Sequence, residues 1–355
     1  MDEPQKLPAT DAKVLADQAI AFGRSLEELE GRRADLAAQG TTDYPAVTEA
    51  LAASYSSLGS LLVTLRPAAD HARPILEAAR TFVSRALHLH QCLPPPPTGD
   101  IEVANWRSLR VSVAHETAGL VHFHLNDPAA ASRRAREALR LSLARWEASH
   151  DNPESVKHVD RCYTSVHQFD EFHDLKSAIH CLGQHIDFLS PIPKEIREHA
   201  EVTSDVGELS ALKEGLQQVI DRVDPVVNRA RELILEGRTD AVNGLAFELA
   251  KSAFSGSRGQ WYTSLNVARC HALVAARAEK ALPLLLAGME DQIRNRAVED
   301  AVRFLRIAAN RGFRGVSAVE SDPDFTAVLT QTEGKKLINQ IRDMPSPVRR
   351  AGRAE

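Results

Sequence analysis

The sequence predicts an all-α protein, a right-handed superhelix of stacked helical hairpins, and three observations lead to that prediction. Aromatic residues make up only 5% of the chain, whereas helix-favouring alanine, leucine, arginine and glutamate are abundant. Small residues recur at helical intervals, at Ala118-Gly119 and again at Ala131, Ala135 and Ala138. Prolines and glycines divide the chain into helix-sized segments. Because each hairpin must bury its apolar face against the next, the pattern predicts a solenoid.

The composition excludes several classes of function. The 355 residues are 43% apolar and 26% charged, the balance of a folded soluble protein. A net charge of -5 provides no attraction for phosphate backbones, so we expect no nucleic-acid partner. No apolar run approaches the roughly 20 residues that cross a bilayer, so we expect no membrane segment. Four scattered cysteines and an N-terminus without a signal region predict a cytoplasmic protein.

The first hundred residues predict a flexible arm, three helices and a spacer. Residues 1–9, with two prolines, form the arm, and apolar residues then recur every three or four positions from Val14 to Leu29. Pro45 starts a second helix, because the N–H groups of the first helical turn have no acceptor within the helix and a proline there costs no hydrogen bond. Pro67 starts a third helix. The proline run at 94–99 cannot continue a helix and predicts a stiff insertion between repeats.

Two helical hairpins are expected next. The first joins helices at 103–124 and 128–149 through Asp127-Pro128, where the aspartate can cap and the proline can start the second helix. The second hairpin joins helices at 153–171 and 175–189.

Pro191 and Pro193 then break the chain, so we place the boundary between two helical lobes there. The lobes are residues 10–190 and residues 191–343, and a disordered basic tail follows at 344–355.

The second lobe should begin with a long helix at 194–221, and Asp224-Pro225 should open another. Its last hairpin pairs helices at 261–278 and 296–310, with a helical insert at 282–293 between them.

The small residues follow the spacing of a tetratricopeptide repeat. Ala131 lies twelve residues after Gly119, and Ala138 lies seven beyond it. One partial copy of the pattern contains Leu58-Gly59 and Leu62 on its first helix, and Ala72 and Ala79 on its second. A weaker copy contains Phe169, Ala178 and Leu182.

In these repeats, the chain resembles the C-terminal tetratricopeptide regions of large bacterial, eukaryotic-like serine/threonine protein kinases. The segments that carry the resemblance are 51–59, 266–273, 301–314 and 322–325. The resemblance implies a tetratricopeptide-like solenoid closed by the segment 321–341, in a bacterial protein. Kinase activity is not implied, because the nucleotide loop and catalytic motifs are missing and Asp324-Phe325 precedes a threonine instead of a glycine.

Tetratricopeptide arrays bind ligands on the concave face formed by the first helix of each hairpin. Polar and aromatic side chains on such a rigid face can bind an extended peptide or a helix. The alternative is that these residues are only solvated or packed in the core. The groove residues expected here are Glu116, Leu120, Phe123, His124, Tyr163, His167, Asp170 and Glu171.

Histidines invite a metal hypothesis, since thirteen of the fourteen lie between His71 and His199. The best set is His158 with Cys162 on one helix, and Cys181 with His185 on the next, because thiolates and imidazoles are zinc ligands. The alternative is that they are ordinary core residues, since buried cysteine is common and no close cysteine pair occurs. The expectation is therefore no metal, no cofactor and no catalytic residue.

These observations predict a non-enzymatic scaffold or adaptor that binds a peptide or a partner protein in the groove of a tetratricopeptide array. Two alternatives stay open. The chain is an accessory sensor or regulatory module of a serine/threonine kinase signalling system, or it is a histidine- and cysteine-rich metal-binding helical protein.

Overall fold

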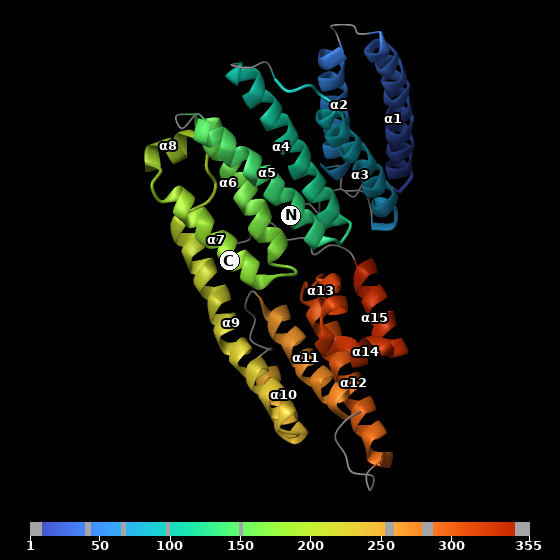
Figure 1. The fold of residues 1–355 in the computed structure, drawn as a ribbon, viewed down its shortest axis with the longest axis vertical. Coiled ribbons are helices and arrows are strands. Elements are labelled where there is room, and N and C mark those ends of the chain that lie inside the picture. The colour runs from blue at the N-terminus through green and yellow to red at the C-terminus, as the bar shows by residue number, and fades with distance from the viewer. Residues whose placement is uncertain are drawn as a thin grey trace. The chain divides into compact units, whose positions relative to one another are not determined.

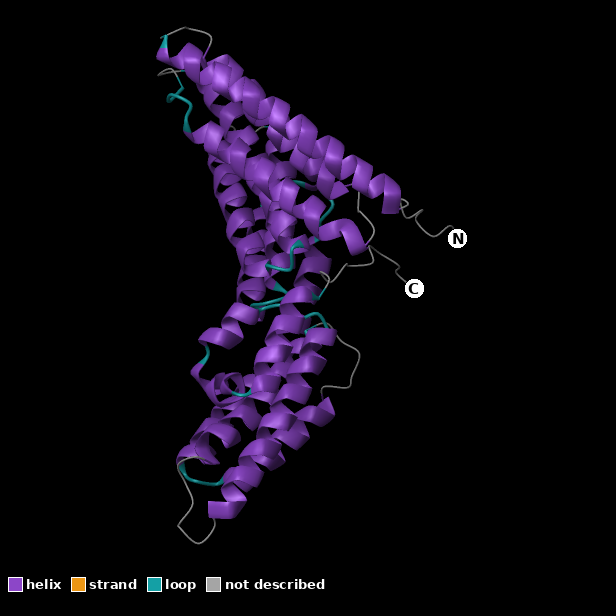
Figure 2. Ribbon diagram, turned by 90° about the vertical axis from the view of Figure 1, so that its right-hand side faces the viewer, coloured by secondary structure: helices purple, strands orange, loops and turns teal. Residues whose placement is uncertain are grey.

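The computed structural model confirms the all-α class. The described part of the chain forms fifteen α-helices and one short 3₁₀ helix, and it contains no strand (Figures 1 and 2). The described residues are 9–39, 44–64, 69–96, 100–148, 152–252, 259–278 and 287–344. Most of the predicted arm, the end of the proline run and nearly all of the basic tail lie outside these ranges.

The chain divides into two compact units, and each consists of two stretches of sequence: residues 1–166 with 192–203, and residues 167–191 with 204–355. This division differs from the predicted boundary at Pro191. The reason is that α7 (Leu175–Leu189) packs against α9 (Val206–Leu235), so the helix before the proline break belongs to the second unit.

The first unit contains α1 to α5, most of α6, and α8. Their bounds are α1 Ala9–Ala38, α2 Tyr44–Thr64, α3 Ala69–Gln91, α4 Ile101–His124, α5 Pro128–Ala148, α6 Pro153–Asp170 and α8 Lys194–His199. As predicted, α2 packs against α3 and α4 packs against α5.

The α4–α5 hairpin forms as its sequence predicts. Asp127 accepts a hydrogen bond at 2.9 Å from the backbone N–H of Ala130, which caps the start of α5. Ala118 on α4 is 6% exposed, and Ala131 and Ala138 on α5 are fully buried. Small side chains therefore occupy the helix crossing.

A glycine allows the same close approach between α2 and α3. A methyl group added at Gly59 would overlap the Val83 side chain on α3. Around this contact, the core contains Leu51, Tyr55 and Leu62 of α2. Among the described helices, α2 is the one whose length and hydropathy would permit it to cross a bilayer.

The predicted apolar face of α1 is only partly correct. Ala19 and Leu26 are buried, but Val14, Phe22 and Leu29 are each about half exposed. The helix packs on α2 and α3 along a narrow line, so residues at its edge remain in solvent.

The second unit contains α7, α9 to α15 and the 3₁₀ helix. Besides α7 and α9, their bounds are α10 Thr239–Ser252, α11 Gln260–Ala278, α12 Ala287–Asn310, α13 Val316–Ser321, the 3₁₀ helix Pro323–Phe325, α14 Thr326–Thr330 and α15 Thr332–Asp343. The predicted hairpin of α11 and α12 is present, and Phe325 and Ile341 of the closing segment are fully buried. The helical insert expected at 282–293 is helical where it is described, but residues 287–293 are the start of α12 and do not form a separate helix.

The helices predicted around Pro225 are also wrong. The first helix after the proline break, α8, ends at His199, and α9 then runs without interruption through Pro225. Asp205 caps α9 by accepting hydrogen bonds from the N–H groups of Gly207 and Glu208. Val223 and Val227 on either side of the proline are buried, so their packing offsets the roughly 3 kcal/mol that an interior proline costs.

Candidate functional site

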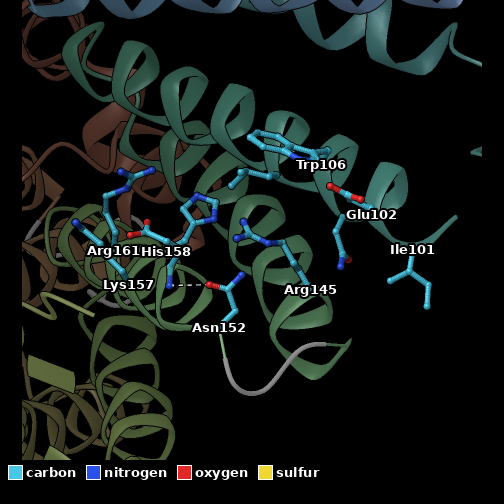
Figure 3. Close-up of a pocket in the computed structure, with 11 residues that line it drawn as sticks. Ile101, Glu102, Trp106, Arg145, Asn152, Lys157, His158 and Arg161 are labelled. Carbon is cyan, nitrogen blue, oxygen red and sulfur yellow. Dashed lines mark hydrogen bonds between the residues drawn. The ribbon is translucent and has the colours of Figure 1, made fainter. Parts of the chain in front are cut away.

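The first unit has a cavity of about 810 Å³ between the start of α4, the end of α5 and the start of α6 (Figure 3). Its wall combines apolar, amide and charged side chains from all three helices. The lining residues are Ile101, Glu102, Asn105, Trp106, Leu109, Arg145, Asn152, Glu154, Lys157, His158 and Arg161.

Helix caps position these side chains. Asp100 accepts a hydrogen bond at 3.0 Å from the N–H of Val103 and fixes the start of α4, where Ile101 and Trp106 lie. Asn152 accepts a hydrogen bond at 3.0 Å from the N–H of Glu154 at the start of α6 (Figure 3). The helical repeat then places cavity residues on successive turns of α6.

Trp106 gives the cavity an accessible aromatic surface. It is 57% exposed, although a tryptophan normally buries most of its large apolar area. Arg110 lies over its ring at 5.9 Å from the centroid, and Ile101, at the start of the same helix, is 67% exposed. An exposed aromatic residue at a cavity is the kind of group that anchors a protein partner.

The charges of the cavity wall are mixed. Arg145, Lys157 and Arg161 line the cavity together with the carboxylates of Glu102 and Glu154. Burial lowers the pKa of Arg145, and the charge of Glu154 opposes that shift. The wall therefore offers hydrogen-bond donors and acceptors together, and its electrostatic field is not dominated by charge of one sign.

Glu116 of α4 lies behind this wall and is held by α6. It is 9% exposed, and its Oε1 lies 2.6 Å from Nε of Arg161. Its Oε2 accepts a hydrogen bond at 2.7 Å from the second guanidinium nitrogen and lies 3.6 Å from Nε2 of His158. Burial alone raises the pKa of Glu116, but His158 and Arg161 outweigh burial and lower it, so the carboxyl is ionised.

A row of buried polar side chains connects His158 to α4 and α5. Nδ1 of His158 lies 3.1 Å from Oγ of Ser142, and that hydroxyl lies 2.9 Å from Oγ of Ser112. Sγ of Cys162 lies 3.5 Å from Ser142, and burial raises the pKa of Cys162 to about 12, so it is a neutral thiol. Ser142 is 2% exposed and donates to the carbonyl of Ala138, so this serine–histidine–glutamate row presents no accessible nucleophile.

Among the predicted groove residues, five in the first unit differ in exposure. Leu120 is 37% exposed, and Phe123 and His124 are half-buried with ring centroids 5.9 Å apart. Glu116 and Tyr163 are buried, so the expectation that they project into a groove is wrong. For Glu116 the physical reason is its ion pair with Arg161.

The other three predicted groove residues, His167, Asp170 and Glu171, belong to the second unit and are buried too. The ring of His167 lies 5.9 Å from that of His185. The carbonyl of Glu171 accepts a hydrogen bond at 2.7 Å from the indole N–H of Trp261. Their packing inside the unit contradicts the expected exposure.

The residues of the metal hypothesis are distributed between the units. Cys181 and His185 lie on α7 in the second unit. His158 and Cys162 lie together in the first unit, where Glu116 joins them, and one ligand atom from each lies within 4.8 Å of the others. The carboxylate comes from α4, which the sequence spacing on α6 could not indicate.

The sequence prediction also missed Trp106, Arg145, Lys157 and Arg161. The sequence offered one signal for this cavity, a tryptophan near the start of a helix. The three basic residues lie 39 to 55 positions after Trp106 in the chain, so the sequence does not show that they line the same cavity.

Comparisons with protein-family models, with curated proteins and with solved structures give no match for this chain. The resemblance to tetratricopeptide regions therefore stays a prediction.

Proposed function

We propose that this chain is a non-catalytic interaction module that binds a peptide segment of a partner protein in the cavity of its first unit. The observation that carries the proposal is Trp106, which is 57% exposed at a cavity of about 810 Å³. An exposed aromatic residue beside a concave polar surface supplies the apolar anchor of a peptide-binding site.

The mixed wall supports a peptide as the ligand. A peptide offers apolar side chains together with backbone donors and acceptors. Asn105 and Asn152 can pair with that backbone, while Ile101 and Trp106 accept an apolar side chain.

We also propose that the hairpins form a tetratricopeptide-like array. Support comes from consecutive hairpins, α2 with α3 and α4 with α5, that have small residues at their crossings. Gly59 and the buried Gly119 occupy the matching positions of the two hairpins.

A peptide-display selection on the purified full chain tests the binding proposal. Selected peptides should bind the Trp106→Ala variant at least about 30-fold more weakly, the loss expected for an interface hot spot. Leu235→Ala is the matched control, because Leu235 is 79% exposed on α9 in the second unit. Labelled peptides measured by fluorescence polarisation should bind this control like the wild type. Equal affinity for Trp106→Ala, or selection of no peptide, would overturn the proposal.

A further inference from the structure

The buried cluster of Glu116, His158 and Cys162 has the composition of a metal site. The three side chains come from α4 and α6, and each is at most 9% exposed. One ligand atom from each lies within 4.8 Å of the others, the separation of groups around a common centre. Carboxylate, imidazole and thiolate are all ligands of zinc.

His158 points one unsatisfied nitrogen into this cluster. Its Nε2 is buried and has no hydrogen-bond partner. The nearest carboxylate oxygen, Oε2 of Glu116, lies 3.6 Å away, which is too long for a hydrogen bond. An unpartnered polar atom at this depth costs free energy, and a cation shared with the carboxylate would remove that cost.

The other side of the ring is held in the way that metal-ligating histidines are held. The Ser142 hydroxyl donates to the carbonyl of Ala138 at 2.8 Å, so its oxygen can accept from Nδ1 of His158 at 3.1 Å. In that tautomer Nε2 carries the lone pair that a metal ion needs, whereas in the metal-free protein a proton on Nε2 faces Glu116 and helps to lower its pKa. A hydrogen bond to the second ring nitrogen is the usual device that orients a histidine toward a metal.

We propose that Glu116, His158 and Cys162 bind one zinc ion, with a water molecule from the adjoining cavity as the fourth ligand. Three protein ligands and one open position form a recognised tetrahedral arrangement. His158 lines the cavity, so water has a route to the ion.

The charges balance. Zinc binding displaces the thiol proton of Cys162 to solvent, and the Zn²⁺ charge is then neutralised by one thiolate and one carboxylate. Glu116 no longer needs Arg161 as its counter-ion. The Arg161 side chain is 54% exposed and lines the cavity, so zinc would release its guanidinium into the proposed peptide site.

The test uses the reduced full-length protein, stripped of metal with a chelator that is then removed. One equivalent of Co²⁺ should produce a thiolate-to-cobalt charge-transfer band and the visible absorption of a tetrahedral ion. One equivalent of Zn²⁺ should abolish both and release about one proton per chain at neutral pH. Free zinc at 100 times its Kd should raise the melting temperature by about 5 °C or more.

Cys162→Ser and Glu116→Gln are the test variants, and Cys270→Ser is the matched control because Cys270 is also fully buried but lies in the second unit. Cys162→Ser should lose the charge-transfer band, and Glu116→Gln should bind cobalt at least tenfold more weakly. The control should behave like the wild type. Circular dichroism of the metal-free variants separates a lost ligand from a lost fold. No uptake at one equivalent, or an unchanged band in Cys162→Ser, would overturn the proposal.

Discussion

Arg161 binds the Glu116 carboxylate with two of its guanidinium nitrogens, at 2.6 and 2.7 Å, and so connects α6 to α4. The Glu116 side chain is largely buried, whereas the Arg161 side chain is 54% exposed. Removal of Arg161 therefore costs free energy of folding, because it leaves the Glu116 carboxylate buried without its counter-ion and without water.

Arg161→Met should therefore destabilise the metal-free protein by about 1–3 kcal/mol, the cost of an unsatisfied buried group. Adding Glu116→Gln should recover most of this loss, since no charge is then left unpaired. Urea unfolding with a chelator present measures both variants. Arg140→Met is the control, because its ion pair with Glu137 is exposed on both sides and should be worth less than about 1 kcal/mol. Independent, additive losses in the double variant would contradict the pairing.

Ala138→Arg should unfold the first unit. Ala138 is fully buried at the crossing of α5 with α4, and a guanidinium cannot occupy that space without an uncompensated charge. We expect a loss of at least about 4 kcal/mol, seen as an early thermal transition by circular dichroism. Ala144→Arg on the same helix is exposed and should melt like the wild type. An unchanged melting curve for Ala138→Arg would disprove this packing.

Gly59→Ala should destabilise the α2–α3 hairpin by about 1–3 kcal/mol, because the new methyl group overlaps Val83. Shortening the neighbour in Gly59→Ala/Val83→Ala should remove that clash. Gly244→Ala is the opposite control: a methyl group there meets nothing within 4 Å, so α10 should gain about 0.5–1 kcal/mol. Chemical denaturation of the four proteins tests the set, and a destabilised Gly244→Ala would show that the glycine effect is not steric.

Stability should fall below about pH 6.5, in part because of His271. Burial lowers the pKa of His271 below its usual 6.5, although the charge of Asp300 opposes the shift. The unfolded chain then binds the proton more tightly, so the stability is fully present above 6.5 and is lost as the pH falls. His271 stacks on Phe304 with ring centroids 5.8 Å apart, and leucine preserves much of that apolar contact.

His271→Leu should consequently show a weaker dependence on pH between 7.5 and 5.5. The difference from the wild type is at most about 1.4 kcal/mol per pH unit for one group. Urea midpoints at several pH values measure it, and parallel curves for the two proteins would refute the assignment. Burial also lowers the pKa of His90 and His122, so the variant should keep part of the dependence.

Local signals predicted much of the fold. The α4–α5 hairpin follows from Asp127-Pro128 and from alanines seven residues apart, which act within one or two turns. The helix boundary predicted at Pro225 was wrong because local sequence does not show tertiary packing. The buried valines on both sides of Pro225 keep α9 continuous.

The candidate site was less predictable because it depends on pairs that are distant in sequence. Glu116 was expected on an exposed face, but its partner Arg161 lies 45 residues later on another helix. The ligand cluster likewise joins α4 to α6, so spacing within α6 identified only His158 and Cys162.

The division of each unit into two stretches affects the order of folding during synthesis. The first unit is incomplete until residue 203 has left the ribosome, and by then α7 has already been made. The apolar side chains of α7, including Leu182 and Leu189, lie on a helix that packs against α9, and this packing forms only after α9 has been made. A nascent chain that pauses in this interval lacks that packing and exposes apolar surface of the kind that chaperones bind. No single cleavage of the backbone would release both units intact.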